Sequence, residues 1–165
     1  MTQLLKCALL LTSIVVLSSC GFRLQGSYQL PDQLQQMQLQ APQFSEFAEQ
    51  AKDRFTQAGI ELVEQSGVYQ VEIVDDTLTR RTLSLSASGQ VAEYELIYKV
   101  NYLLRDPQGR SAALEVEVFR DYQDDPNFAL AKTREREIIV AEMREQAAQQ
   151  LLRQVIARVS ASTSE

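Results

Sequence analysis

The clearest pattern in the chain is an alternation between residues 93 and 104, in which every second residue is apolar. Because successive side chains of a β-strand point to opposite faces of a sheet, this alternation predicts a strand with one buried face. The residues expected on that face are Tyr94, Leu96, Tyr98, Val100, Tyr102 and Leu104. The sequence Asp-Pro-Gln-Gly at 106–109 is typical of a turn. A second alternating segment, 112–121, then predicts an antiparallel partner strand.

Shorter strand patterns precede this hairpin. Residues 37–40 alternate between apolar and polar, and residues 60–63 and 69–78 also have the composition of strands. Residues 79–90 combine Arg80 and Arg81 with several hydroxyl side chains and a glycine. They predict an extended, twisted arm or the end of a long hairpin.

Two segments have the three- and four-residue spacing of apolar side chains that predicts amphipathic helices. The first covers residues 44–58, and its apolar face is expected to hold Phe44, Phe47, Ala48, Ala51, Phe55 and Ala58. We interpret these phenylalanines as core residues rather than as the lining of a ligand groove. The second helix begins at Asn127 or Thr133 and ends near residue 160, with an apolar stripe that starts at Ile139.

Together these elements predict a single α+β domain. It is a two-layer sandwich, with two helices packed on one face of a four-stranded mixed, mostly antiparallel sheet. The expected parallel pair is formed by the first strand, the first helix and the returning strand, a connection that is almost always right-handed. The other face of the sheet carries several charges and is expected to be exposed or covered by a partner.

The N-terminus has the features of a lipoprotein signal peptide over residues 1–19. Lys6 precedes an apolar run, and Leu-Ser-Ser-Cys at 17–20 matches the lipobox pattern. The run is shorter than the about 20 residues that a membrane-spanning helix needs. We therefore expect cleavage before Cys20, whose thiol would carry the lipid that anchors the chain to a membrane.

The expected mature protein is one domain over residues 20–165, with a tether over 20–34 and a frayed tail over 160–165. Gly21, rather than aspartate, follows the lipidated cysteine. Because aspartate at this position commonly retains lipoproteins at the inner membrane, Gly21 favours the outer membrane.

Composition excludes several classes of function. The 165 residues include no histidine and only two cysteines, of which Cys7 would leave with the signal peptide and Cys20 would be lipidated. This excludes a disulfide and catalysis by serine–histidine or cysteine–histidine pairs, and we expect neither a metal site nor a cofactor. The net charge of −6 becomes −7 when Lys6 is removed. Nucleic-acid-binding proteins usually have the opposite sign, so we expect no nucleic-acid partner.

Two local groups of basic residues remain in this acidic chain. One is Arg80-Arg81, and the other consists of Lys132, Arg134 and Arg136. These cations could meet the phosphates or carboxylates of an anionic ligand if the fold brings them together. Otherwise they are solvated surface charges, and the sequence does not decide between these two interpretations.

Other polar and aromatic groups favour structural interpretations. Asp75-Asp76 and Asp124-Asp125 stand at a strand end or turn, where aspartate commonly bonds to nearby backbone, rather than in a catalytic or calcium-binding pattern. The ladder of Tyr94, Tyr98 and Tyr102 is interpreted as a half-buried sheet surface rather than as a sugar site. The sequence contains no phosphate-binding glycine loop and no nucleophile motif, which favours a non-enzymatic protein.

Short motifs distributed along the chain give it a further resemblance. They are Cys-Gly-Phe-Arg-Leu-Gln-Gly at 20–26, Gly-Gln-Val-Ala-Glu-Tyr at 89–94, Val-Phe-Arg at 118–120, Asp-Pro-Asn-Phe-Ala-Leu-Ala-Lys at 125–132, Glu-Met at 142–143 and Ala-Ala-Gln-Gln-Leu-Leu-Arg at 147–153. In order and spacing they closely resemble the rare lipoprotein B or LptE family of lipopolysaccharide-assembly lipoproteins. The resemblance extends from Cys20 to about residue 158.

The resemblance implies two helices against a four-stranded sheet, and a non-enzymatic function. Proteins of this family plug the lumen of the outer-membrane β-barrel LptD, support its assembly and bind lipopolysaccharide during transport to the cell surface. Lys132 is then the first candidate for a lipopolysaccharide contact. Arg80 and Arg81 are further candidates, because Ala87 and Ser88 stand where some relatives carry a basic residue. The alternatives are an envelope scaffold lipoprotein with another outer-membrane or peptidoglycan partner, and a lipoprotein enzyme.

Overall fold

The computed structural model describes residues 30–87 and 89–162. In chain order these residues form η1 (Asp32–Leu34), β1 (Gln36–Gln40), α2 (Glu46–Gln57), β2 (Glu61–Leu62), β3 (Tyr69–Leu85), β4 (Val91–Arg105), β5 (Ser111–Gln123), η2 (Pro126–Phe128) and α3 (Ala129–Ser162). The expected signal peptide, the lipidated Cys20 and most of the expected tether lie outside the described residues. The described end of that tether belongs to the fold, because Leu34 is fully buried and Leu30 packs against the core.

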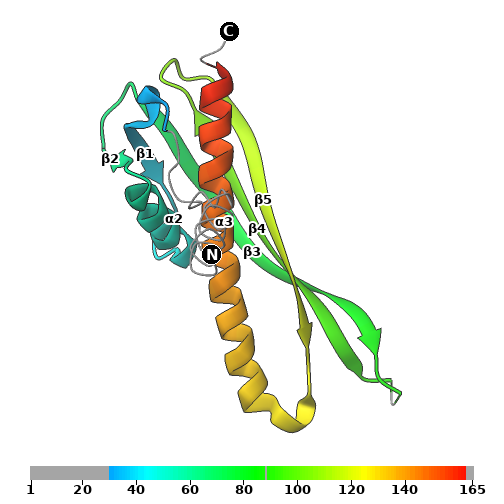
Figure 1. Cartoon of the computed structure of the whole chain (residues 1–165). Helices are drawn as coiled ribbons and strands as arrows, with labels where there is room; N and C mark the ends of the chain where they lie inside the picture. Colours follow the sequence, from blue (N-terminus) through cyan, green and yellow to red (C-terminus); the bar gives the residue numbers. More distant parts are fainter. Residues whose placement is uncertain (1–29, 88, 163–165) are drawn as a thin grey trace, which may run out of the picture.

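The predicted α+β architecture is confirmed. A mixed sheet has the strand order β2-β1-β3-β4-β5, and both α-helices lie on one of its faces (Figure 1). β1 is parallel to both of its neighbours, β2 and β3, whereas β4 is antiparallel to both β3 and β5. The sheet has five strands rather than the predicted four, because the two-residue β2 pairs with β1 at the edge.

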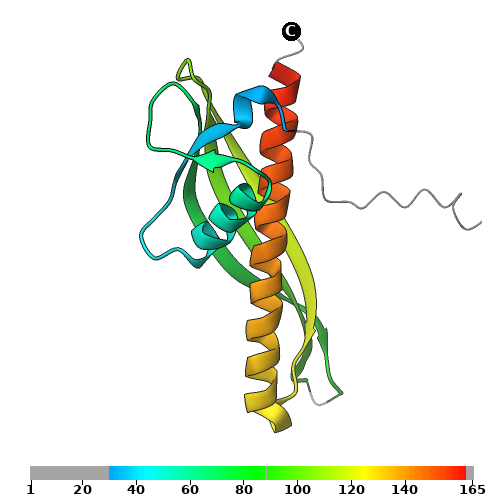
Figure 2. The same cartoon turned by 60° about the vertical axis from the view of Figure 1, so that its left-hand side comes forward.

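The β3–β4 hairpin is longer than the strand patterns indicated. β3 continues through the predicted arm to Leu85, and β4 returns from Val91. β1 pairs with β3 only as far as Glu72, so the rest of this hairpin extends beyond the body of the domain. We call residues 78–87 and 89–96 the distal arm. Figures 1 and 2 show it at the same end of the molecule as the start of α3.

α3 is the longest element and covers the sheet along its length (Figure 2). Its 34 residues span about 51 Å at 1.5 Å per residue. It begins at Ala129, between the two starts considered from the sequence, and reaches Ser162, so it includes the first three residues of the segment expected to fray. Its buried residues begin only at Val140, so the first three turns of the helix have no buried side chain.

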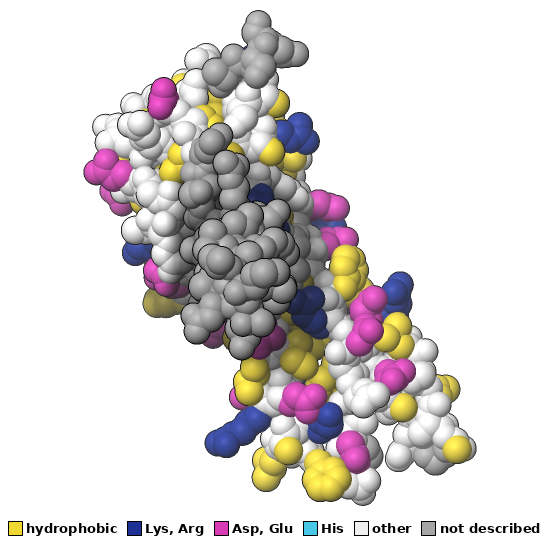
Figure 3. Space-filling view, viewed as in Figure 1, with side chains coloured by type: hydrophobic (Ala, Val, Ile, Leu, Met, Phe, Trp, Pro, Cys, Tyr) yellow, Lys and Arg dark blue, Asp and Glu magenta, His cyan; other side chains and the backbone are white. Residues whose placement is uncertain are grey.

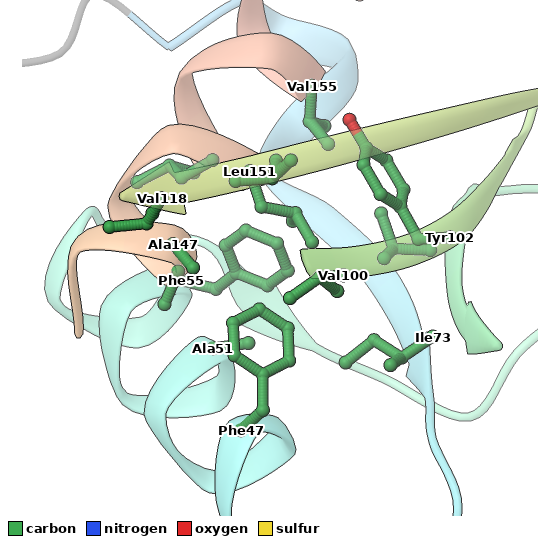
Figure 4. Packing of buried hydrophobic residues seen from close by; sticks show 14 of the residues in the cluster. Phe47, Ala51, Phe55, Ile73, Val100, Tyr102, Val118, Ala147, Leu151 and Val155 are labelled. Carbon is green, nitrogen blue, oxygen red and sulfur yellow. The ribbon is translucent and has the colours of Figure 1, made fainter. Parts of the chain in front are cut away.

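The core lies between the sheet, α2 and the C-terminal part of α3. Figure 4 shows Phe47 and Phe55 of α2 pointing toward Val100 of β4 and Leu151 of α3. The alternation predicted for β4 is confirmed, since its even-numbered residues from 96 to 104 are all buried. The tyrosine ladder lies deeper than expected: Tyr94 is half-buried, but Tyr98 and Tyr102 are fully buried.

The prediction that Phe44 joins this core is wrong. Ser45 caps α2, because its Oγ accepts a hydrogen bond of 3.1 Å from the Ala48 amide, and the helix therefore begins at Glu46. Phe44 precedes the cap with a φ of 63° and a side chain that is 99 % exposed. A positive φ costs a residue with a Cβ atom about 1 kcal/mol.

Candidate functional site

A groove of about 800 Å³ opens at the distal end, between the distal arm, the end of β5 and the start of α3. Its lining residues are Leu78, Thr79, Arg80, Tyr94, Leu96, Tyr122, Asp124, Ala129, Lys132, Thr133 and Arg136. Three of these residues are basic and one is acidic, in a chain whose net charge is −6. The fold therefore concentrates positive charge in this groove.

Two tyrosines form part of the groove and position its cations. Tyr94 of β4 lies directly opposite Tyr122 of β5 in the antiparallel register. The guanidinium carbon of Arg80 lies 4.6 Å from the centre of the Tyr94 ring, and Nζ of Lys132 lies 5.5 Å from the centre of the Tyr122 ring. These are distances at which a cation is attracted to an aromatic face.

Tyr122 also fixes the start of α3. Its hydroxyl donates a hydrogen bond of 2.9 Å to the backbone carbonyl of Lys132, and burial raises the pKa of this tyrosine. A tyrosine hydroxyl is already protonated at neutral pH, and the raised pKa keeps it a donor at higher pH as well. Asp125 caps η2 just before the helix, because its Oδ1 accepts a hydrogen bond of 2.9 Å from the Asn127 amide.

The three basic residues of the groove differ in how far they are already paired. Nζ of Lys132 lies 2.9 Å from Oε2 of Glu135, and this hydrogen bond raises the lysine pKa. Arg80 and Arg136 have no ion-pair partner among the described residues. Their guanidinium groups are available to an anion without first giving up a carboxylate.

The structure brings Arg80 and Lys132 together but places Arg81 elsewhere. Arg81 pairs with Glu95 across the β3–β4 ladder, with 2.7 Å between Nη2 and Oε2, and does not line the groove. Alternation along a strand allows only one of two adjacent arginines to face the helices. A register shift between Ile73 and Asp75 determines which of the two arginines does so. Before the shift, the buried residues of β3 are odd-numbered. After it, the even-numbered Arg80 pairs with the buried Leu96 and therefore faces the helices.

Apolar residues lie exposed on both sides of the groove. Phe128 at the end of η2 and Leu130 at the start of α3 are 64 % and 88 % exposed, and Leu83 and Leu85 in the distal arm are also exposed. In the space-filling view, apolar and basic side chains lie close together at this end (Figure 3). A groove with cations inside and apolar residues around it suits a ligand that is both anionic and lipidic.

The pair Asp75-Asp76 lies within β3 rather than at a strand end or turn as expected, and both of its side chains bond to β4. Asp75 accepts a hydrogen bond of 2.6 Å from Asn101, and Asp76 accepts one of 2.6 Å from the buried Tyr98 hydroxyl. Within residues 30–87 and 89–162, no group of three or more carboxylate, cysteine or histidine side chains could hold a metal ion. The same residues include no helix long and apolar enough to span a membrane.

Tyr122 was not among the site residues predicted from the sequence, although the strand pattern and the hairpin turn were enough to place it. It continues the alternation of Val116 and Val118 on the inner face of β5. The hairpin turn at 106–109 places this tyrosine opposite Tyr94 once the pairing is extended from the turn. Arg136 had been noted only as one member of a basic group, since the sequence does not show which side of α3 meets the distal arm.

Comparison with known proteins gives a consistent result. Residues 34–155 match the model of the family described as LptE, lipopolysaccharide-assembly. The LPS-assembly lipoprotein LptE of Pectobacterium atrosepticum is 30 % identical over 148 residues, covering 87 % of this chain and 80 % of the relative. Its counterpart in Yersinia pestis is 32 % identical over 148 residues, covering 87 % of this chain and 72 % of the relative.

Solved structures agree with this assignment. The rare lipoprotein B of Shewanella oneidensis superposes with a TM-score of 0.72 at 36 % identity, over 79 % of this chain and 99 % of that protein. An uncharacterized lipoprotein B of Nitrosomonas europaea superposes with a TM-score of 0.68 at 31 % identity, over 86 % of this chain and 94 % of that protein. The chain therefore belongs to the LptE lipopolysaccharide-assembly family.

Proposed function

We propose that this protein is an outer-membrane lipoprotein, anchored through a lipid on Cys20, that plugs the LptD β-barrel, supports its assembly and binds lipopolysaccharide. The family implies a role in lipopolysaccharide assembly. The part played with LptD follows from the resemblance to this family, the lipopolysaccharide site is inferred from the groove of this chain, and the role is non-enzymatic. The observation that carries the proposal is the meeting of Arg80, Lys132 and Arg136 in one groove beside exposed apolar residues.

Lipopolysaccharide fits the chemistry of the groove. Its lipid A portion combines phosphate groups with acyl chains, and guanidinium groups bind phosphate through paired hydrogen bonds. Arg80 and Arg136 would receive the phosphates first, and Lys132 would join when it exchanges Glu135 for the ligand. Phe128 and Leu130 would then lie against the acyl chains.

The rest of the surface suits the lumen of a barrel. The outward residues of β4 include Glu93, Glu95, Lys99 and Asn101, so the uncovered face of the sheet is largely polar, with a few apolar residues such as Ile97 and its partner Phe119. Lumens of large outer-membrane barrels are polar and are commonly plugged by protein. With about 51 Å in α3, the domain is long enough to extend through a bilayer of about 40–45 Å including its headgroups.

Lipopolysaccharide binding is tested with the purified lipoprotein in detergent at low salt. The double variant Arg80→Gln, Lys132→Gln removes two groove cations, and the matched control Arg81→Gln, Arg134→Gln removes two cations that do not line the groove. We expect the first variant to bind lipopolysaccharide about tenfold more weakly and the second to lose much less affinity. Equal losses in the two variants would show that only general charge matters and would contradict the groove assignment.

Barrel association is tested separately by purifying the tagged lipoprotein from outer membranes and identifying its partners by mass. We expect LptD in roughly equal amount. Recovery with a different envelope protein and without LptD would instead support the scaffold alternative.

A further inference from the structure

Phe44 combines two unfavourable features that no neighbouring residue explains. At 99 % exposure it is the most exposed large apolar residue of the described chain. It is also the only non-glycine residue among those described that has a positive φ. A strained backbone at a non-glycine residue is found mainly at functional sites, so the exposed Phe44 ring is a candidate contact.

Helix initiation does not require this side chain. An apolar residue just before a helix cap commonly packs against the fourth residue of the helix. Here that residue is Glu49, and a ring that is 99 % exposed packs against nothing in the domain. The capping hydrogen bond comes from Ser45 alone, so glycine at position 44 would satisfy the same backbone with less strain.

We propose that Phe44 is an anchor residue that inserts into an apolar recess of a protein partner. It is the last residue of an exposed, uncharged loop, 41–44, which is held between the end of β1 and the capped start of α2. A ring presented in this way loses little conformational freedom on binding, and buried aromatic side chains dominate the binding energy of many interfaces.

The charges around Phe44 favour a protein over an anionic lipid as the occupant. Glu46 and Glu49 are exposed in the first turn of α2, directly after the loop. Glu46 is paired with Arg144, so it is the carboxylate of Glu49 that repels a phosphate-bearing surface such as lipopolysaccharide. The recess that receives Phe44 therefore has an apolar floor and a rim that donates hydrogen bonds or carries positive charge.

The Phe44 contact is separate from the ligand groove. Glu46, two residues after Phe44, pairs with Arg144 of α3, with 2.6 Å between Oε2 and Nη1. Arg144 lies eight residues beyond Arg136 of the groove, or about 12 Å along the helix.

The protein partner that receives Phe44 is identified as the barrel LptD, and this identification rests on the proposed function.

The test compares full-length tagged lipoproteins purified from outer membranes. The variants are Phe44→Gly and Phe44→Ser, with Phe44→Tyr as the variant that keeps the ring and Gln43→Ser as the loop control. We expect the first two to recover LptD at least about tenfold less, the other two to recover it normally, and lipopolysaccharide binding to stay unchanged. The melting temperature of Phe44→Gly should equal or exceed that of the original protein.

Normal recovery of LptD by Phe44→Gly would overturn the inference. A lowered melting temperature in both Phe44→Gly and Phe44→Ser would also overturn it, because the ring would then have a structural role. If the unaltered lipoprotein recovers no LptD, the barrel part of the proposed function fails and the named partner fails with it. If the unaltered protein recovers LptD and Phe44→Gly does so equally, only the anchor fails.

Discussion

At the scale of single residues, Lys132 is restrained by its own helix as well as exposed to the groove. Its Nζ lies 2.9 Å from Glu135, one helical turn further on, and 5.5 Å from the Tyr122 ring. An anionic ligand must therefore compete with Glu135 for this ammonium. Exposed ion pairs of this kind contribute up to about 1 kcal/mol, so the competition is modest.

Removing that competition should strengthen ligand binding. We expect Glu135→Gln to raise the affinity of the lipoprotein for lipopolysaccharide about two- to fivefold at low salt, measured by titration of the purified protein. Glu137→Gln is the control, because it makes the same change in net charge on the same helix but Glu137 has no ion-pair partner among the described residues. An equal gain in both variants would mean that net charge, and not the release of Lys132, sets the affinity.

The candidate residues illustrate what a sequence can predict at this scale. Alternation along β4 correctly identified Tyr94 and Leu96 as inward-facing, because a two-residue period depends only on the local chain. The choice between Arg80 and Arg81 was not available, because it depends on the register shift at Ile73 and Asp75. The meeting of Arg80 with Lys132 depends on the packing of α3, which no local pattern contains.

At the scale of elements, α2 shows how one capping residue changes the role of its neighbours. The spacing of Phe44, Phe47 and Phe55 is that of a single helical stripe. Ser45 starts the helix after Phe44, so only the other two enter the core, where the Phe47 ring lies 6.2 Å from the Tyr98 ring. The stripe was therefore predicted correctly except at its first member.

The two phenylalanines should respond oppositely to truncation. Phe47→Ala removes a fully buried ring and should lower the free energy of unfolding by about 3–5 kcal/mol. Phe44→Ala removes an exposed ring and should change it by about 0.5 kcal/mol or less. Urea denaturation followed by circular dichroism measures both. A loss above about 1 kcal/mol in Phe44→Ala would mean that the ring packs within the domain.

Element boundaries were predicted best where an apolar pattern accompanied them. The apolar stripe of α3 was expected from Ile139, and its buried residues begin at Val140. The earlier part of the helix, Ala129–Ile138, has no such stripe, which is why its start was left between Asn127 and Thr133. Residues 60–63 were expected to have strand character, and two of them, Glu61 and Leu62, pair with β1 and add a fifth strand to the four predicted.

At the scale of the whole molecule, the domain has a well-packed body and a sparsely packed distal end. The body contains α2, the C-terminal part of α3 and the sheet beside them, and it holds the fully buried side chains. The distal end contains the distal arm and the first three turns of α3, where exposed residues predominate. The groove residues Arg80 and Lys132 lie in this second region, so the proposed binding site is in the part of the fold with the least packing.

This distribution of packing predicts a gradient of local stability. Amides in regions with few buried contacts open at a lower free energy than those of the core. In hydrogen–deuterium exchange followed by mass spectrometry, we expect residues 78–87, 89–96 and 129–139 to exchange faster than residues 98–104 and 140–159. Binding of lipopolysaccharide should slow exchange mainly in the faster segments, because the ligand would join the distal arm to the start of α3. Uniform exchange along α3 would contradict the gradient, and protection confined to α2 would place the ligand away from the groove.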